Sequence, residues 1–222
     1  MSFIVGKNAV VVCLGDSITA AEDGYVTVMQ NLISAGYPER NIRIVNAGRG
    51  GNRSTDMLAR LQEDVVAHNP NVVTISAGIN DVWKRYRIRT PYTEYPNGDG
   101  AEGVSVEVYE AVLGEMVDIL RETTEAEIVL MSPTLIGEDI ENPNNKPNAT
   151  LKEYVAAVER VAHSRNTLLA PAHEAFIGTL QAGRTVNPDF CLTTDGVHLN
   201  PIGNHVLALT VLATLGFAGL GG

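Results

Sequence analysis

Short apolar runs alternate along most of the chain with longer segments whose apolar residues recur at helical spacing. The short runs are rich in β-branched residues and predict strands, which we place at 8–14, 42–45, 71–76, 128–131 and 167–170. Apolar positions three or four apart predict the helices, which we place at 25–36, 54–66, 104–122, 149–164, 172–181 and after Pro201. This alternation predicts an α/β protein: a three-layer α/β/α sandwich with a central five-stranded parallel sheet.

Three of the predicted strands run directly into polar loops. These loops are Gly15–Thr19, residues 48–52 and residues 78–81. Because parallel strands bring their carboxyl ends to one edge of a sheet, we expect the three loops to converge on a single site.

A serine and a distant acid–base pair are the candidate catalytic residues. Ser17 follows the first strand, and its hydroxyl needs a base within hydrogen-bond reach to become a good nucleophile. Asp195 and His198 lie three positions apart, so the carboxylate can orient the imidazole while the imidazole accepts the serine proton. This arrangement predicts a serine hydrolase.

Attack by a serine on an ester places negative charge on the carbonyl oxygen, which fixed donors must stabilise. The candidates are the backbone N–H groups of Ser17 and Gly51 and the side-chain amide of Asn80. Gly48 and Gly50 are alternatives to Gly51, because a backbone donor beside a ligand benefits from the absence of a side chain.

Four sequence blocks in order resemble those of the SGNH, or GDSL-type, esterase and lipase family. They are Gly15-Asp16-Ser17, residues 48–52, Gly78-Ile79-Asn80-Asp81 and Asp195-x-x-His198, and the resemblance extends over about residues 8–215. It implies a flavodoxin-like SGNH hydrolase fold, a single domain over residues 1–222 and catalysis without a metal or other cofactor. It also implies that Ser17, Asp195 and His198 are catalytic and that Ser17, Gly51 and Asn80 form the oxyanion hole.

The segment from Gly78 to Trp83, with Tyr25-Val26 and Asn46, is most similar to the acetylxylan esterase branch of intracellular sugar deacetylases. The chain departs from that branch at Ala20-Ala21-Glu22 and at Gly196. The resemblance implies a small-molecule ester substrate, with O-acetyl groups of carbohydrates as the first expectation. A short-chain lipase, thioesterase or lysophospholipase of the same family is the alternative.

Four residues near these blocks are candidates for substrate binding: Asp16, Asp81, Trp83 and Val197. Asp16 and Asp81 also fit a structural role, in which their carboxylates accept hydrogen bonds from loop backbone. The mixed aromatic and basic run 83–95 fits either a substrate contact or an amphipathic flap. The size of the acyl pocket is expected to depend on loops 83–103 and 133–147.

Other classes fit the sequence less well. A nucleotide-binding Gly-x-Gly-x-x-Gly pattern fails at Arg53, and the Gly-x-Ser-x-Gly elbow of the α/β-hydrolase fold fails at Thr19. A catalytically silent carbohydrate-binding protein on this fold remains the alternative from another class, although all the expected catalytic positions are occupied.

Charge and composition limit the classes of partner that the protein is expected to bind. The formal net charge of −10 argues against nucleic-acid binding. No apolar run approaches the roughly 20 residues that span a bilayer, and the N-terminus does not resemble a signal peptide, so we expect no membrane insertion and a cytoplasmic protein.

Cys13 and Cys191 are expected to be reduced, with a disulfide as the alternative. The apolar segment 212–217 is either core or the interface of a homo-oligomer.

Overall fold

The computed structural model describes residues 2–86 and 102–219, and five parallel strands form its centre in the order β2-β1-β3-β4-β5. The strands are β1 (Val10–Gly15), β2 (Arg43–Gly48), β3 (Val72–Ser76), β4 (Glu127–Met131) and β5 (Leu168–Ala170). This is the predicted five-stranded α/β fold, with the strand order typical of flavodoxin-like proteins.

The register of the sheet aligns the carboxyl ends of the strands. Gly15 at the end of β1 lies beside Gly48 at the end of β2, and Ser76 at the end of β3 lies beside Met131 of β4. After β1 the chain turns to β2 on one side, whereas β3 lies on the other side, so the strand order reverses next to β1. In open parallel sheets, ligands bind at such a reversal, outside the carboxyl ends of the strands.

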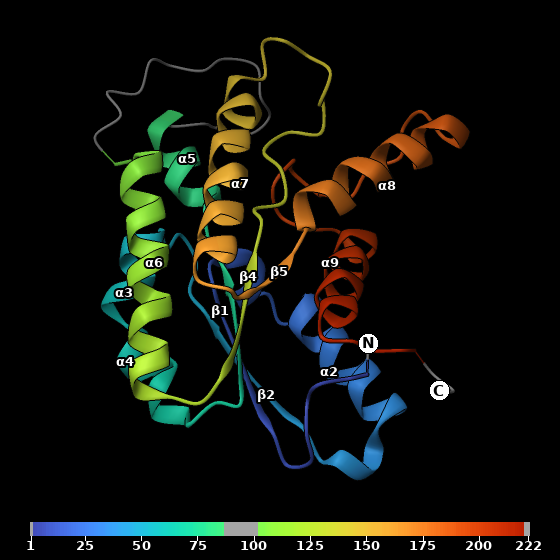
Figure 1. Ribbon diagram of the computed structural model, residues 1–222. Coiled ribbons are helices and arrows are strands. Elements are labelled where there is room, and N and C mark those ends of the chain that lie inside the picture. The colour runs from blue at the N-terminus through green and yellow to red at the C-terminus, as the bar shows by residue number, and fades with distance from the viewer. Residues whose placement is uncertain (1, 87–101, 220–222) are drawn as a thin grey trace.

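Helices cover both faces of the sheet (Figure 1). They are α1 (Ser17–Ala20), α2 (Tyr25–Gly36), α3 (Ser54–Ala59), α4 (Leu61–Asp64), α5 (Ile79–Tyr86), α6 (Val106–Thr123), α7 (Lys146–Ser164), α8 (Ala172–Val186) and α9 (Pro201–Thr214), with 3₁₀ turns at Pro38–Arg40 and Val66–His68. Helix α2 packs against α9, while α6 packs against α3 and α7. Right-handed crossovers put the connection from β1 to β2 on the opposite face from those leading to β3, β4 and β5.

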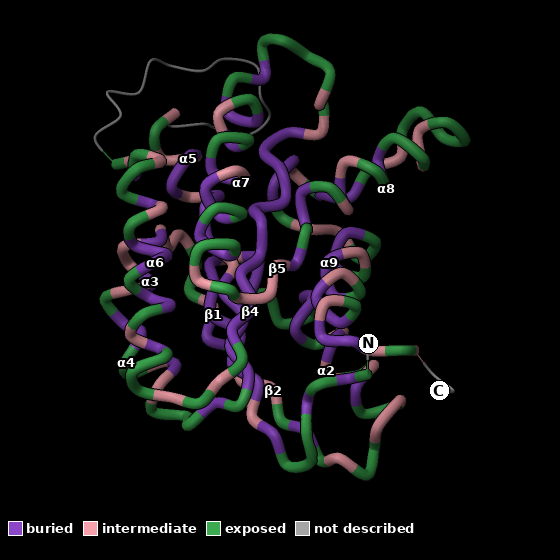
Figure 2. The backbone as a smooth tube through the Cα atoms, viewed as in Figure 1, coloured by how far each residue is buried: buried purple, intermediate pink, exposed green. Residues whose placement is uncertain are grey.

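Burial follows this layering. The central strands β1, β3 and β4 are mostly buried, whereas the edge strands β2 and β5 are less so. The helices bury their sheet-facing sides and expose their outer sides (Figure 2). The apolar C-terminal segment belongs largely to the core: Leu212 and Leu215 are fully buried, and the Phe217 ring packs edge-on against the rings of Phe3 and Tyr37.

Several predicted boundaries were wrong. The helix expected at 54–66 is divided into α3, α4 and a 3₁₀ turn. Ser54 is the first helical residue, and the Asp56 carboxylate accepts the backbone N–H of Arg53, which holds the cap position. The loop expected at 78–81 is already helical from Ile79, and α8 continues to Val186 instead of ending at 181. Much of the aromatic and basic run expected at 83–95 lies outside the described residues.

The two cysteines are separate. Cys13 is buried in β1 and Cys191 is exposed, and both are free thiols, so the alternative of a disulfide between them is wrong. None of the helices within residues 2–86 and 102–219 is long and apolar enough to cross a membrane.

Candidate active site

Ser17 is the first residue of α1, directly beyond the buried end of β1. The Asp16 side chain caps this short helix by accepting the backbone N–H of Ile18 at 3.0 Å. The turn is tight, because a Cβ on Gly15 would lie 2.0 Å from Thr19 Oγ1. A buried strand and a capped helix therefore fix the Ser17 backbone.

Asp195 and His198 form a compact turn before α9. Asp195 Oδ1 accepts the backbone N–H groups of Val197 at 3.0 Å and His198 at 2.8 Å, and Gly196 between them has a φ of +86°. The other carboxylate oxygen, Asp195 Oδ2, lies 2.7 Å from His198 Nδ1. Partial burial opposes ionisation of Asp195, but the hydrogen bonds from His198 and Val197 outweigh it and lower the pKa of this carboxyl.

The structure brings Ser17 to the histidine. Ser17 Oγ lies 3.0 Å from His198 Nε2. Because the Asp195 carboxylate accepts, Nδ1 carries the ring proton in the neutral imidazole and Nε2 offers a lone pair to the serine hydroxyl. The three side chains thus have the geometry of a nucleophile, a general base and a group that orients the base.

Asn80 connects the three polar loops. It lies in the first turn of α5, after β3, and its Nδ2 donates to Asp16 Oδ2 at 3.2 Å and to the Asn52 carbonyl at 3.1 Å. Asp16 follows β1 and Asn52 follows β2, so the expected convergence of the three loops is confirmed. Both hydrogens of the Asn80 amide are engaged here, so a ligand oxygen must share one of them or displace an acceptor.

The three glycines of the loop at 48–52, which follows β2, differ in their surroundings. A Cβ on Gly48 would lie 2.3 Å from the Ala20 nitrogen, so Gly48 allows α1 to approach β2 closely. Gly50 lies nearest Ser17, with an added Cβ 3.9 Å from Ser17 Cβ. Gly51 has a φ of +75° and open space around its Cβ position. Gly48 therefore has a packing role, which leaves Gly50 and Gly51 as the candidates for a backbone donor.

The candidates for substrate binding are mostly buried. Asp16, Asp81 and Val197 are each at most 3% exposed, whereas Trp83 is partly buried against the core. Asp81 accepts the Ser54 backbone N–H with both carboxylate oxygens at 3.1 Å and the Ser54 hydroxyl with one at 2.5 Å. The Asp81 carboxylate thereby fixes the start of α3. Both Asp16 and Asp81 accept backbone N–H groups, which are the contacts that a structural role requires.

Burial changes the acidity of both carboxyl groups. Burial is the main cause that raises the pKa of Asp16 to about 6, and the nearby Asp81 adds to it, while the hydrogen bond from Ile18 opposes it. Burial also raises the pKa of Asp81, against the hydrogen bonds from Ser54. A partly protonated Asp16 beside Asn80 reduces the negative charge near the candidate oxyanion donors.

Arg60 is a positioning residue that the sequence did not reveal. Its guanidinium is buried and donates to the carbonyls of Gly15 at 2.9 Å and Ala47 at 2.8 Å, and to Asn52 Oδ1 at 2.7 Å. It also pairs with Asp64 at 2.8 Å. Arg60 therefore holds the ends of β1 and β2 against the loop at 48–52. A single arginine between two short helices does not indicate such a role in the sequence.

Glu138 anchors the segment before Asp195 and was also missed. Its Oε1 accepts the backbone N–H groups of Leu192 at 2.8 Å and Thr193 at 2.6 Å and the Thr193 hydroxyl at 2.5 Å. Its Oε2 pairs with Arg184 at 3.2 Å. These partners are 46 to 55 positions away, so no local pattern predicts them.

No group of three or more His, Cys, Asp and Glu side chains with metal-binding geometry occurs within residues 2–86 and 102–219.

Comparison with known proteins finds a family model and several solved structures that match nearly the whole chain. A model of the GDSL-like lipase/acylhydrolase family matches residues 13–206. An acetylxylan esterase from Geobacillus stearothermophilus is 32% identical over 227 positions, covering 96% of each chain. The crystal structure of Axe2, an acetylxylan esterase from that organism, has a TM-score of 0.82 at 31% identity and covers 98% of each chain. LAE5, an α/β hydrolase from the metagenome of Lake Arreo in Spain, has a TM-score of 0.82 at 29% identity, over 97% of this chain and 99% of its own.

Three solved variants of Axe2 are described as catalytic mutants. They replace a serine, an aspartate and a histidine by alanine, and that aspartate and histidine lie three positions apart. Asp195 and His198 have the same spacing, and the Ser17 hydroxyl is hydrogen-bonded to His198.

Proposed function

Because the chain belongs to the GDSL-like lipase/acylhydrolase family and is therefore an ester hydrolase, we propose that it removes small acyl groups through a covalent intermediate on Ser17. We further propose that its substrates are O-acetyl esters of carbohydrates and that the whole chain acts as one domain. The observation that carries the proposal is the continuous chain of hydrogen bonds from Ser17 Oγ through the His198 ring to the Asp195 carboxylate.

The first half of the reaction forms the acyl-enzyme. Ser17 Oγ attacks the carbonyl carbon of the ester while His198 Nε2 accepts the hydroxyl proton, and the Asp195 carboxylate stabilises the resulting imidazolium. The carbonyl oxygen becomes an oxyanion that the N–H groups of Ser17 and Gly51 and the amide of Asn80 stabilise. The intermediate then expels the alcohol, which takes the proton from His198.

The second half regenerates the enzyme. Water attacks the acyl carbon and gives a proton to His198 Nε2, so that a second oxyanion forms at the same position. When this intermediate collapses, Ser17 leaves, recovers the proton from His198 and releases the carboxylic acid. The net reaction consumes one ester and one water and yields one alcohol and one acid.

Two observations favour acetylated carbohydrates among the possible esters. The similarity to an acetylxylan esterase extends over 96% of the chain. Two further Axe2 variants with TM-scores of 0.83 are described as acetyl-xylooligosaccharide esterases. This substrate class therefore has the best support.

A chain-length series tests the proposal. Hydrolysis of p-nitrophenyl acetate, butyrate, octanoate and palmitate should be compared with release of acetate from acetylated xylotriose, using wild type and Ser17→Ala. We expect turnover to be greatest on acetyl esters, including the sugar ester, and to be lost in Ser17→Ala. Highest kcat/KM on octanoate or palmitate would instead identify a lipase or thioesterase specificity, and equal turnover by the two proteins would overturn Ser17 as nucleophile.

A further inference from the structure

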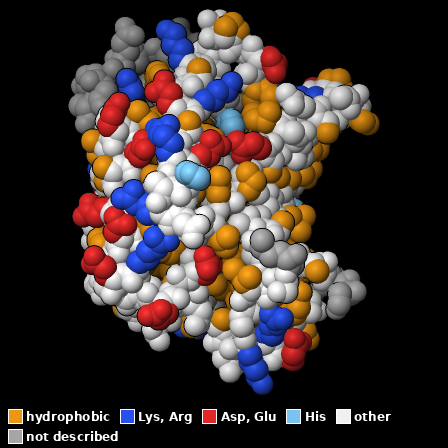
Figure 3. All heavy atoms as spheres, in the orientation of Figure 1, with side chains coloured by type: hydrophobic (Ala, Val, Ile, Leu, Met, Phe, Trp, Pro, Cys, Tyr) orange, Lys and Arg blue, Asp and Glu red, His pale blue; other side chains and the backbone are white. Residues whose placement is uncertain are grey.

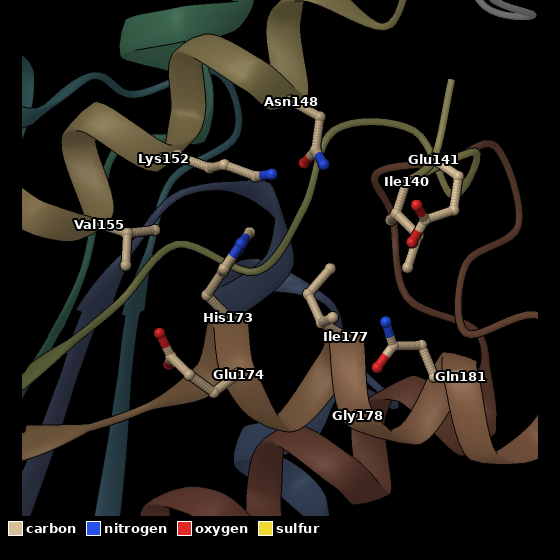
Figure 4. A pocket seen from close by; sticks show the side chains of 10 residues that line it. All are labelled: Ile140, Glu141, Asn148, Lys152, Val155, His173, Glu174, Ile177, Gly178 and Gln181. Atoms are coloured by element: carbon tan, nitrogen blue, oxygen red, sulfur yellow. The ribbon is translucent and has the colours of Figure 1, made fainter. Parts of the chain in front are cut away.

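A second cavity lies between α7 and α8, and its lining includes none of the proposed catalytic residues. Its volume is about 570 Å³, within the range of about 300–1,000 Å³ that is usual for small-molecule sites. Figure 4 shows the lining side chains, which come from α7, from α8 and from the loop that precedes α7. Ile140, Val155 and Ile177 supply the apolar part of the wall.

Asn148 presents two free donors to this cavity. The residue is only 3% exposed, and its Oδ1 accepts the backbone N–H of Ile136 at 3.2 Å. Because that N–H can only donate, the contact fixes the orientation of the amide and leaves Nδ2 on the other side. In Figure 4 the amide projects into the cavity, and none of residues 2–86 and 102–219 forms a hydrogen bond with Nδ2.

His173 presents an acceptor to the same space. It is 7% exposed, and its Nδ1 lies 2.6 Å from the Thr134 carbonyl. A carbonyl can only accept, so Nδ1 carries the proton of the neutral ring and Nε2 keeps its lone pair. The imidazole points into the cavity from α8, opposite Asn148 (Figure 4). Within the described part of the chain, Nε2 has no hydrogen-bond partner.

The charges around the cavity do not favour an anionic ligand. Lys152 reaches in from α7, while Glu141 and Glu174 lie on the wall, and none of the three forms an ion pair with another described residue. Two carboxylates against one ammonium disfavour an anion. On the surface as a whole, acidic and basic side chains are interspersed across the face seen in Figure 3.

From these contacts we propose that the cavity between α7 and α8 is a second binding site for a neutral polyhydroxylated ligand of the sugar or polyol class. A hydroxyl group both donates and accepts, so one hydroxyl can bond to His173 Nε2 and another, or the same one, to Asn148 Nδ2. A purely apolar ligand would leave both buried groups unpaired. The C–H faces of a sugar fit the side chains of Val155 and Ile177.

Isoleucine methyl NMR spectra can separate this site from the catalytic site. Ile140 and Ile177 line the cavity, whereas Ile18 and Ile79 are neighbours of Ser17 and Asn80. Protein labelled at the isoleucine δ1 methyl groups should be titrated with unesterified xylotriose, with xylitol and with sodium acetate. Neither sugar probe is a substrate for ester hydrolysis, so the titration is independent of the proposed activity.

We expect xylotriose or xylitol to shift the Ile140 and Ile177 signals in a saturable way, and acetate to leave them unchanged. A shift confined to Ile18 and Ile79 would place sugar binding at the catalytic site alone and overturn the proposal. The proposal would also be overturned if the Ile140 and Ile177 signals shifted with acetate but with neither sugar probe. The same holds if they shifted with none of the three compounds.

Gly178→Trp provides the blocking variant, and Ala182→Trp is its control. Gly178 lines the cavity, and a Cβ placed there meets nothing within 4 Å. Ala182 is exposed one turn further along α8 and does not line the cavity. Gly178→Trp should weaken sugar binding at least tenfold and leave hydrolysis of p-nitrophenyl acetate unchanged, while Ala182→Trp should change neither.

Asn148→Asp is the second variant, because it keeps the oxygen that accepts the Ile136 N–H and removes the two free donors. It should also weaken binding at least tenfold. Wild-type affinity in both Gly178→Trp and Asn148→Asp would contradict the assignment of this cavity.

Discussion

Ser17 Oγ lies 3.0 Å from His198 Nε2, although 181 positions separate the two residues along the chain. The contact depends on two rigid supports, the capped turn after β1 and the Asp195 turn before α9. Single substitutions can disrupt each support, and each hydrogen-bond donor around it, separately.

Asp195→Asn should lower kcat by on the order of 10⁴-fold. The asparagine retains an oxygen for the backbone N–H groups of Val197 and His198, but it presents an amide N–H to His198 Nδ1. That change favours the tautomer with the proton on Nε2, which cannot accept the serine proton. Steady-state kinetics on p-nitrophenyl acetate measure the effect, and a decrease below tenfold would contradict the orienting role.

Asn80→Ala should lower kcat by about 10²–10³-fold with little change in KM, because an oxyanion donor acts mainly in the transition state. Thermal unfolding should be recorded alongside, since Asn80 also bonds to Asp16 and to the Asn52 carbonyl. A decrease in kcat of less than threefold would contradict a role for Asn80 in the oxyanion hole. A larger effect confined to KM would contradict it as well.

Glu138→Ala should reduce the free energy of unfolding by about 2–4 kcal/mol, because it leaves the donors of Leu192 and Thr193 without their acceptor. Glu138→Gln is the matched control. It keeps one acceptor oxygen and loses only the ion pair with Arg184, so its cost should stay below about 1.5 kcal/mol. Urea denaturation compares the two, and equal losses would show that the ion pair, rather than the contacts to Leu192 and Thr193, is the important interaction.

Asp16 should make stability depend on pH. Its pKa in the folded protein, about 6, exceeds its ordinary value of 3.8, so the folded state binds the extra proton between these values. The contribution of Asp16 to stability should therefore fall as pH rises from about 4 to about 6, by up to about 3 kcal/mol. Asp16→Asn lacks this titration, and its stability relative to wild type should increase across that window.

Denaturation of wild type and Asp16→Asn in urea at several pH values between about 4 and 7 tests this dependence. The substitution also changes the contact with Asn80, which adds an offset that does not vary with pH. A stability difference that is constant across the range would contradict the raised pKa of Asp16.

The sheet and the main site contacts were predictable because they follow from local patterns. Buried strands such as β1 and β3 are short β-branched runs, and a parallel sheet must bring their carboxyl ends together. The three-residue spacing of Asp195 and His198 is itself sufficient for their contact in one turn. Asn80 could be placed near Ser17 because both follow neighbouring strands.

The remaining features depend on tertiary contacts that leave no local signal. The apolar spacing over 54–66 predicts one helix, but Arg60 ends α3 and sends its guanidinium to the carbonyls of Gly15 and Ala47. From the sequence, Asp81 was a candidate for substrate binding. Its buried hydrogen bonds to Ser54 join residues 27 positions apart, so no local pattern indicates them. For the same reason, the position of Asn148 and His173 on the wall of one cavity could be recognised only in the structure.

Covalent labelling with a fluorophosphonate is the most direct test of Ser17 as the nucleophile, because such a reagent reacts with the activated serine of a hydrolase and remains attached. Intact mass spectrometry and peptide mapping should be applied to wild type, Ser17→Ala and the exposed control Ser34→Ala. We expect one adduct per chain on Ser17 in wild type and in Ser34→Ala, loss of esterase activity in proportion to labelling, and no adduct in Ser17→Ala. An adduct on another residue that abolishes activity, or full activity with Ser17 labelled, would contradict it.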